Sequence, residues 1–254
     1  MLNVYFNILL MAYLNIIFCK YMCYSTPMSF SFAFVGILSA IYLLIYNNLK
    51  YDYLPLLLLF YSFMEILQGV QYYYVNQCKN KINIFLTEIA YILVILQPFM
   101  WNFFYYNNTV GCDKNYFIIG MILSVCWSIT SILTRILYTK ENGIKYEQSV
   151  YANETSCTKK DKGHLYWQWS SANFFDLNPG MLMYLLIWMV PALISKQHRT
   201  ISIILLLSLF LSLLFSYYNN EVTTITSLWC YVSVPIVLVV IFNIMIKVKY
   251  NRLK

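Results

Sequence analysis

The sequence Leu54–Val75, LPLLLLFYSFMEILQGVQYYYV, is the apolar run that decides the fold. At 1.5 Å per residue it reaches about 33 Å as a helix, enough to cross a hydrocarbon core of roughly 30 Å. The run nevertheless carries Glu65, Gln68 and Gln71 at spacing i, i+3, i+6, which puts them on one slowly drifting helical face. An ionisable group in the middle of a span usually faces protein or water. The run therefore predicts a membrane helix with polar partners elsewhere in the chain.

The composition of the whole chain fits the same class of protein. Of its 254 residues, 61% are hydrophobic, 19% aromatic and only 11% charged. Soluble domains have roughly a quarter charged residues. The apolar runs are continuous rather than alternating, which argues against a transmembrane β-barrel. The net charge of +7 does not indicate nucleic-acid binding, because the basic residues lie in loops and the tail rather than in one patch. The lipid bilayer is the expected partner.

The apolar runs predict an all-α membrane protein. We expect a seven-helix transmembrane bundle over residues 22–254, with an additional N-terminal hydrophobic helix or signal anchor at residues 1–20. A long polar segment, residues 139–177, separates the fourth core span from the fifth, and its aromatic second part is expected at the membrane surface. The predicted core spans are Met28–Tyr46, Leu54–Val75, Ile84–Phe104, Tyr116–Tyr138, Pro179–Ile194, Thr200–Tyr217 and Thr226–Ile246.

The charge of the short loops predicts the orientation. Segments rich in Lys and Arg tend to stay cytoplasmic. The tail KVKYNRLK and the loop SKQHRT are both basic, so we expect a cytoplasmic C-terminus and an outer location for residues 139–177. Asn153-Glu154-Thr155 in that segment is a possible glycosylation site, which agrees with this orientation.

Two cysteines would lie outside in this orientation. Cys78 precedes the third core span and Cys157 lies in the long segment, so a disulfide between them could hold the segment over the mouth of the bundle. The alternative is that the seven cysteines of this apolar chain are mostly small buried residues.

The intramembrane polar residues fall at compatible depths in the outer half of the bundle. Arg135 shares a helical stripe with three serines and lies at about the depth of Glu88. This predicts an outward-facing polar cavity with Glu88 and Arg135 near its mouth, Gln68 and Gln71 along it, and Glu65 at its floor. Alternatively, such polar groups only hold helices together. The serines are Ser124, Ser128 and Ser131.

A second cluster lies in the long outer segment and contains His164 and Trp167. These side chains could form a lid that stacks on or hydrogen-bonds a ligand. The alternative is an aromatic belt at the membrane interface.

Several chemistries are disfavoured by what the sequence contains. Its two histidines fall on opposite sides in this topology, so no metal site and no cofactor are expected. No Ser or Cys has a nearby His within a span to activate it. An intramembrane enzyme is therefore the least favoured class of function.

Phrases spread over residues 22–194 resemble those of an uncharacterised multi-pass membrane family of giant DNA viruses. The resemblance implies a viral source and a host or virion membrane, and it carries over no activity. The phrases are MCYSTPMS, FMEILQG, LQPFMWN, CWSITS and GHLYWQW followed by NPGMLMYLLIWMVPAL.

Two functions are consistent with these features. The first is binding or transport of a small solute or ion through the outward cavity. The second is a receptor-like or virion and host-membrane interaction protein without transport activity, which binds partners through residues 139–177.

Overall fold

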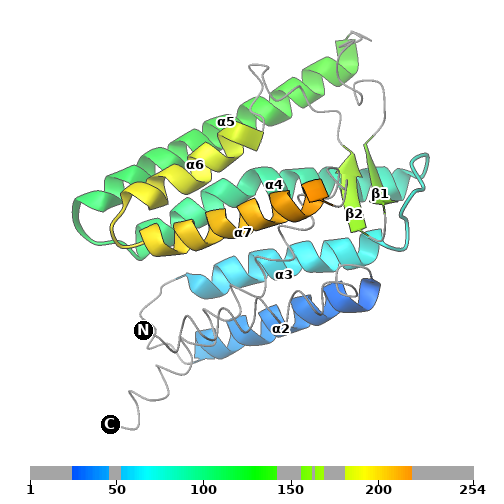
Figure 1. Cartoon of the computed structure of the whole chain (residues 1–254). Helices are drawn as coiled ribbons and strands as arrows, with labels where there is room; N and C mark the ends of the chain where they lie inside the picture. Colours follow the sequence, from blue (N-terminus) through cyan, green and yellow to red (C-terminus); the bar gives the residue numbers. More distant parts are fainter. Residues whose placement is uncertain (1–24, 46–52, 142–155, 162–163, 169–180, 219–254) are drawn as a thin grey trace.

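The computed structural model describes residues 25–45, 53–141, 156–161, 164–168 and 181–218. Within these residues it has six α-helices, one short 3₁₀ helix and one β-hairpin (Figure 1). The helices are α2 (Thr26–Ile45), α3 (Leu54–Gln71), α4 (Lys81–Asn107), α5 (Lys114–Glu141), α6 (Met181–Ile194) and α7 (Arg199–Tyr218), with η1 (Gly111–Asp113) before α5. The strands are β1 (Cys157–Asp161) and β2 (His164–Gln168).

The predicted count of seven core helices is not supported. Six of the predicted spans coincide with α2 to α7, while the predicted span Thr226–Ile246 and the N-terminal residues 1–20 lie outside the described residues. Four helices, α2 to α5, are long and apolar enough to cross a membrane. The apolar stretches of α6 and α7 are shorter, Met183–Ile194 and Arg199–Leu214. A 14-residue helix such as α6 is only about 21 Å long, less than a hydrocarbon core.

The prediction of an all-α protein is also wrong in one place. The long polar segment contains a hairpin in which β1 and β2 pair antiparallel, from Cys157 opposite Gln168 to Asp161 opposite His164. Only Lys162 and Gly163 separate the paired ends in the sequence, a typical length for a hairpin connection. Figure 1 places the hairpin where α3 ends and α4 begins.

The helices run alongside one another around α4. Helix α4 packs against α3, α5 and α6, α2 packs against α3, and α7 packs against α6. The two turns at the ends of α4 define two ends of the bundle. We call the end with the hairpin the hairpin end, and the other, where α4 connects to α5 and α6 connects to α7, the turn end (Figure 1).

Helices α2 and α3 approach closely because small residues line α2. Ser29, Ala33, Gly36 and Ala40 recur at helical spacing and are all buried. A Cβ added at Gly36 would collide with the Ser62 hydroxyl of α3. Small residues allow helix backbones to come close and gain van der Waals contact, as is common in membrane bundles.

Candidate functional site

The hairpin is joined to the α3–α4 turn by a buried polar cluster around Asn83. The Asn83 side chain donates to the carbonyls of Tyr74 at 2.6 Å and Thr158 at 3.0 Å, and its Oδ1 accepts from the Thr158 N–H at 2.9 Å. The hydroxyls of Thr87 and Thr158 lie 2.8 Å apart. Asn83 is only 1% exposed, and Thr87 and Thr158 are fully buried. One amide side chain thus connects the α3–α4 turn, the start of α4 and β1.

The outer edge of β1 is covered by the same turn. The Asn76 N–H donates to the Thr158 carbonyl at 3.0 Å, and Asn76 Oδ1 accepts from the Lys160 N–H at 3.0 Å. Asn76 has φ 64°, a left-handed conformation that asparagine tolerates better than most residues. A disulfide joins Cys78 of this turn to Cys157 at the start of β1. The hairpin is therefore held by one covalent bond and by hydrogen bonds on the strand edge that would otherwise be open.

Gln71 and Trp167, two of the predicted ligand-binding residues, contact each other. The Trp167 indole N–H donates to Gln71 Oε1 at 2.9 Å, and Gln71 Nε2 donates to the Leu86 carbonyl at 3.0 Å. Gln71 is 1% exposed. Its amide thus joins β2 to helices α3 and α4.

Glu65 lies on a different face of α3 from Gln71. Its carboxyl group interacts with the Ser29 side chain of α2, whereas Gln71 contacts α4 and the hairpin. A separation of six residues rotates a side chain by about 120° around a helix, which explains why the two do not converge. Gln68, between them, is half-buried. The polar residues predicted to share one face of α3 are therefore divided between its contact with α2 and its contact with α4.

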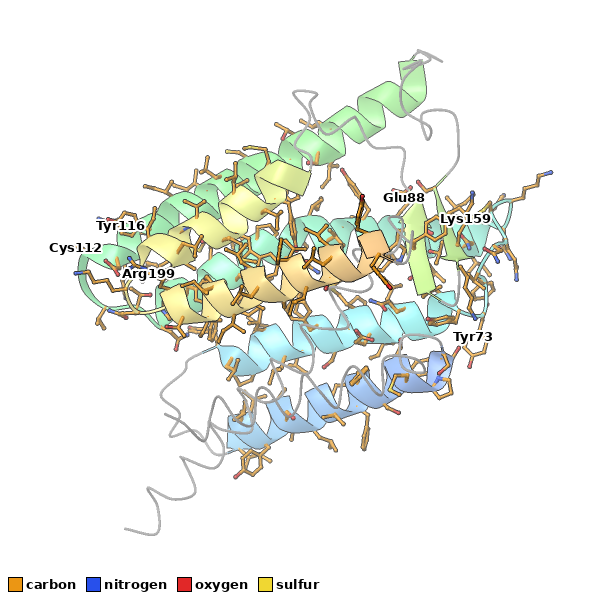
Figure 2. All side chains as sticks on the ribbon, viewed as in Figure 1. Tyr73, Glu88, Cys112, Tyr116, Lys159 and Arg199 are labelled. Atoms are coloured by element: carbon orange, nitrogen blue, oxygen red, sulfur yellow. A yellow bond between two sulfur atoms is a disulfide. The ribbon has the colours of Figure 1, made fainter. Side chains whose placement is uncertain are left out.

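The remaining predicted site residues are placed only in part. Glu88 is half-buried on α4 and lies at the hairpin end, near the strands (Figure 2). Arg135 lies in α5 and His164 in β2, but their side chains are outside the described part of the structure, as is Asn153 entirely. The predicted pairing of Glu88 with Arg135 stays a prediction.

The serines predicted to share a stripe on α5 face the interior of the bundle. Ser124, Ser128 and Ser131 are all buried, and the Ser128 hydroxyl donates to the Ile95 carbonyl of α4 at 3.1 Å. The Ser124 hydroxyl donates within α5 to the Gly120 carbonyl at 2.7 Å, and the Ser131 carbonyl accepts from the Tyr91 hydroxyl of α4 at 3.5 Å. This is the pattern expected of polar contacts between membrane helices.

Further polar contacts join the helices at mid-length. Gln97 of α4 accepts a hydrogen bond from the Tyr184 hydroxyl of α6 and donates to the Met64 sulfur of α3. The Asn102 amide of α4 donates to the Ile187 carbonyl of α6 at 3.0 Å. These amides, like that of Gln71, each join two or more helices. Within the described residues, no group of three or more His, Cys, Asp or Glu could hold a metal ion.

At the turn end, two loops meet in what we call the turn junction, residues 108–113 and 195–198. The Thr109 hydroxyl lies 2.9 Å from His198 Nε2, and Asp113 Oδ2 accepts from the Ser195 hydroxyl at 3.0 Å. Val110 and Gln197 exchange two hydrogen bonds. Both Thr109 and His198 are buried. The junction fixes α4 and α5 relative to α6 and α7.

Neither the Asn83 cluster nor the turn junction was predicted from the sequence. The available signal was weak: Asn83 and Thr87 are spaced i, i+4 at the start of an apolar run, so they share a helix face. Nothing in the sequence indicated that Thr158, 71 residues later than Thr87, would meet them.

Residues 27–250 match a family described only as a family of unknown function, DUF5765. The chain is also 25% identical over 227 residues to the uncharacterized protein R287 of Acanthamoeba polyphaga mimivirus, covering 84% of this chain and 91% of that protein. No solved structure matches it. The predicted resemblance to an uncharacterised family found in giant viruses is confirmed, and the match extends beyond residue 194 to residue 250.

Proposed function

The chain belongs to DUF5765, a family of unknown function, and we propose that this member is a multi-pass membrane protein that presents a locked hairpin as a partner-binding platform. The observation that carries the proposal is the joint use of a disulfide and the buried Asn83 cluster to fix a short hairpin on one end of an apolar helical bundle.

The distribution of polar and apolar side chains supports a membrane location. Buried positions between the helices hold amides and hydroxyls, while large apolar side chains cover the outside, such as Phe34 at 62% exposed and Phe210 at 56%. Soluble monomers rarely expose contiguous apolar surface of this extent. In a bilayer, lipid chains cover such a surface at no cost and hydrogen bonds between helices are protected from water.

The two ends differ in cysteine chemistry, which supports an orientation. The hairpin end carries the Cys78–Cys157 disulfide, which persists in oxidising compartments. The turn end carries Cys112, a free and exposed thiol, and the basic residues Lys114, Lys196 and Arg199. We place the turn end and the C-terminus on the cytoplasmic side, because the disulfide fits an oxidising compartment for the hairpin end and the tail KVKYNRLK is basic.

The exposed surface of the hairpin end suggests the kind of partner. Tyr73 is 64% exposed, and Lys79, Lys81 and Lys160 are exposed at the same end of the bundle. Lys160 lies over the Tyr72 ring with its ammonium 5.8 Å from the ring centroid. A surface of lysines and tyrosines fits an acidic partner, because tyrosine supplies rigid contact area and lysine supplies charge.

Photo-crosslinking tests this proposal with a control on the same protein. A photoreactive phenylalanine analogue replaces Tyr73 at the hairpin end or Tyr116 at the turn end, which Figure 2 shows at opposite ends of the bundle. In membranes of infected or co-cultured host cells, we expect a discrete crosslinked product from position 73 only. Equal products from both positions, or none from position 73, would contradict the platform.

A second candidate is solute or ion binding at Glu65, which the position of this carboxyl group within the apolar helix α3 favours. A carboxyl group in the middle of α3 is costly unless it has a partner, and intramembrane carboxyls often serve proton or ion pathways. Proteoliposomes test this with two probes, a proton gradient and a sodium gradient. Faster dissipation by the wild type than by E65Q supports the second candidate, and equal rates that match empty liposomes exclude it for these ions.

A further inference from the structure

His198 occupies the centre of the turn junction, among aromatic rings. It is 3% exposed, and its ring centroid lies 4.7 Å from that of Tyr105 in α4 and 5.7 Å from that of Phe117 in α5. Its Nε2 is 2.9 Å from the Thr109 hydroxyl, and the ring also hydrogen-bonds the backbone of Asn108. One titratable side chain of the α6–α7 turn is thus enclosed by the ends of two other helices.

Counting protons around the ring shows that the contacts differ between its two charge states. The Thr109 hydroxyl also lies 2.6 Å from the Tyr105 carbonyl, to which it can donate its single proton. When it does so, His198 Nε2 must be the donor to Thr109. If the Thr109 hydroxyl donates to His198 instead, a neutral imidazole accepts at Nε2 and still has one N–H for the Asn108 backbone, so the neutral ring can make both contacts. The imidazolium can only donate, so Thr109 must turn its proton to the Tyr105 carbonyl, and the ring is then buried as a cation.

We propose that the turn junction is a proton-binding site, in which protonation of His198 loosens the contact between the α4–α5 turn and the α6–α7 turn. The ligand is the proton itself, and the responding element is the packing of the two turns. This inference does not depend on the partner-binding platform at the opposite end.

The surroundings of His198 determine which charge state the closed junction prefers. Burial lowers the pKa of His198, and this effect exceeds the opposing effects of the Asn108 backbone hydrogen bond and the Asp113 carboxylate. Asp113 is the acid facing it, and it is already engaged by Ser195 and the Lys196 N–H. The neighbouring cations are engaged elsewhere: Arg199 donates to the Leu193 and Ile194 carbonyls and Lys114 lies over the Tyr106 ring.

The sign of the effect follows from this lowered pKa. An opened junction exposes His198 and returns its pKa toward the ordinary value of about 6.5. The open form therefore binds protons more strongly than the closed form. The closed junction is fully stable above about pH 6.5 and loses stability as the pH falls from there toward the lowered pKa.

Histidine NMR on the full chain in nanodiscs tests the proposal directly. The chain has two histidines, so an H164Q variant assigns the His198 signal without touching the junction. We expect His198 to titrate below 6.5, and D113N to lower the midpoint further because it removes the favourable carboxylate. A midpoint at or above 6.5 in the wild type would overturn the proposal.

Thermal unfolding supplies a second readout. The melting temperature of the wild type should fall between pH 7 and pH 5 relative to that of H198Q, which keeps a polar side chain but does not titrate, and H164Q should follow the wild type. Parallel pH profiles for wild type and H198Q would overturn the proposal. If H198Q does not fold, the melting temperatures of D113N and the wild type are compared instead. We expect the melting temperature of D113N to fall more between pH 7 and pH 5, and an equal or smaller fall would overturn the proposal.

Discussion

Replacing Asn83 with alanine should release β1 from the helical bundle. The variant loses four side-chain hydrogen bonds, to the Tyr74 carbonyl, the Thr158 carbonyl, the Thr158 N–H and, at 3.3 Å, the Thr87 hydroxyl. A typical hydrogen bond contributes about 0.5–1.5 kcal/mol net, and a buried group left without a partner costs about 1–3 kcal/mol. Because Thr158 is fully buried, we expect a loss of about 2–4 kcal/mol in docking free energy, or roughly 30- to 1,000-fold in the docking equilibrium.

Amide hydrogen exchange of Thr158 measures this loss at the place where it occurs. This amide donates to Asn83 rather than to β2, so its protection reports docking of the hairpin and not pairing of the strands. The matched control is Asn80→Ala in the same turn. The Asn80 side chain caps α4 by accepting from the Ile82 N–H, and it donates to Gln77 Oε1 within the same turn. Unchanged Thr158 protection in N83A, or an equal loss in N80A, would refute the assignment of docking to Asn83.

Three further results are expected. Trp167→Phe and Gln71→Leu should each destabilise the hairpin, and their double-mutant cycle should give a coupling of about 0.5–1.5 kcal/mol; a coupling near zero would mean that the 2.9 Å contact contributes nothing. Replacing both disulfide cysteines with serine should lower stability in detergent by about 4 kcal/mol, because the bond closes a loop of 79 residues, and an unchanged denaturation midpoint would contradict this. Gly36→Ala should lower the melting temperature, because the added methyl group forces α2 and α3 apart. Adding Ser62→Ala should restore part of that fall, and no restoration would show that the collision with Ser62 is not the cause.

The helices could be predicted from the sequence because their apolar runs are long. The predicted bounds of α3 and α4 differ from the structure by four residues or fewer at each end. The hairpin was missed because five residues of a strand such as Cys157–Asp161, CTKKD, show little hydrophobic alternation. Its position depends on contacts with Asn76 and Asn83, which are distant in the sequence.

The candidate site was less predictable than the fold, because depth in the membrane does not determine the direction of a side chain. Glu65 and Gln71 fall on one apolar run, yet they contact α2 and α4 respectively. The rotation of each helix about its axis is set by packing, such as that of Gly36 against Ser62. A sequence pattern gives the period of a helix and not the identity of the neighbour on each face.

Thiol labelling in sealed vesicles tests the central claim, that the bundle crosses a membrane with its two ends on opposite sides. The background protein keeps Cys112 and the Cys78–Cys157 pair and has its other cysteines replaced by serine. In vesicles with the original outer face exposed, we predict that a membrane-impermeant maleimide labels Cys78 and Cys157 after an impermeant reductant is added, whereas Cys112 reacts only after permeabilisation. Labelling of Cys112 and the reduced pair from the same side would contradict the account.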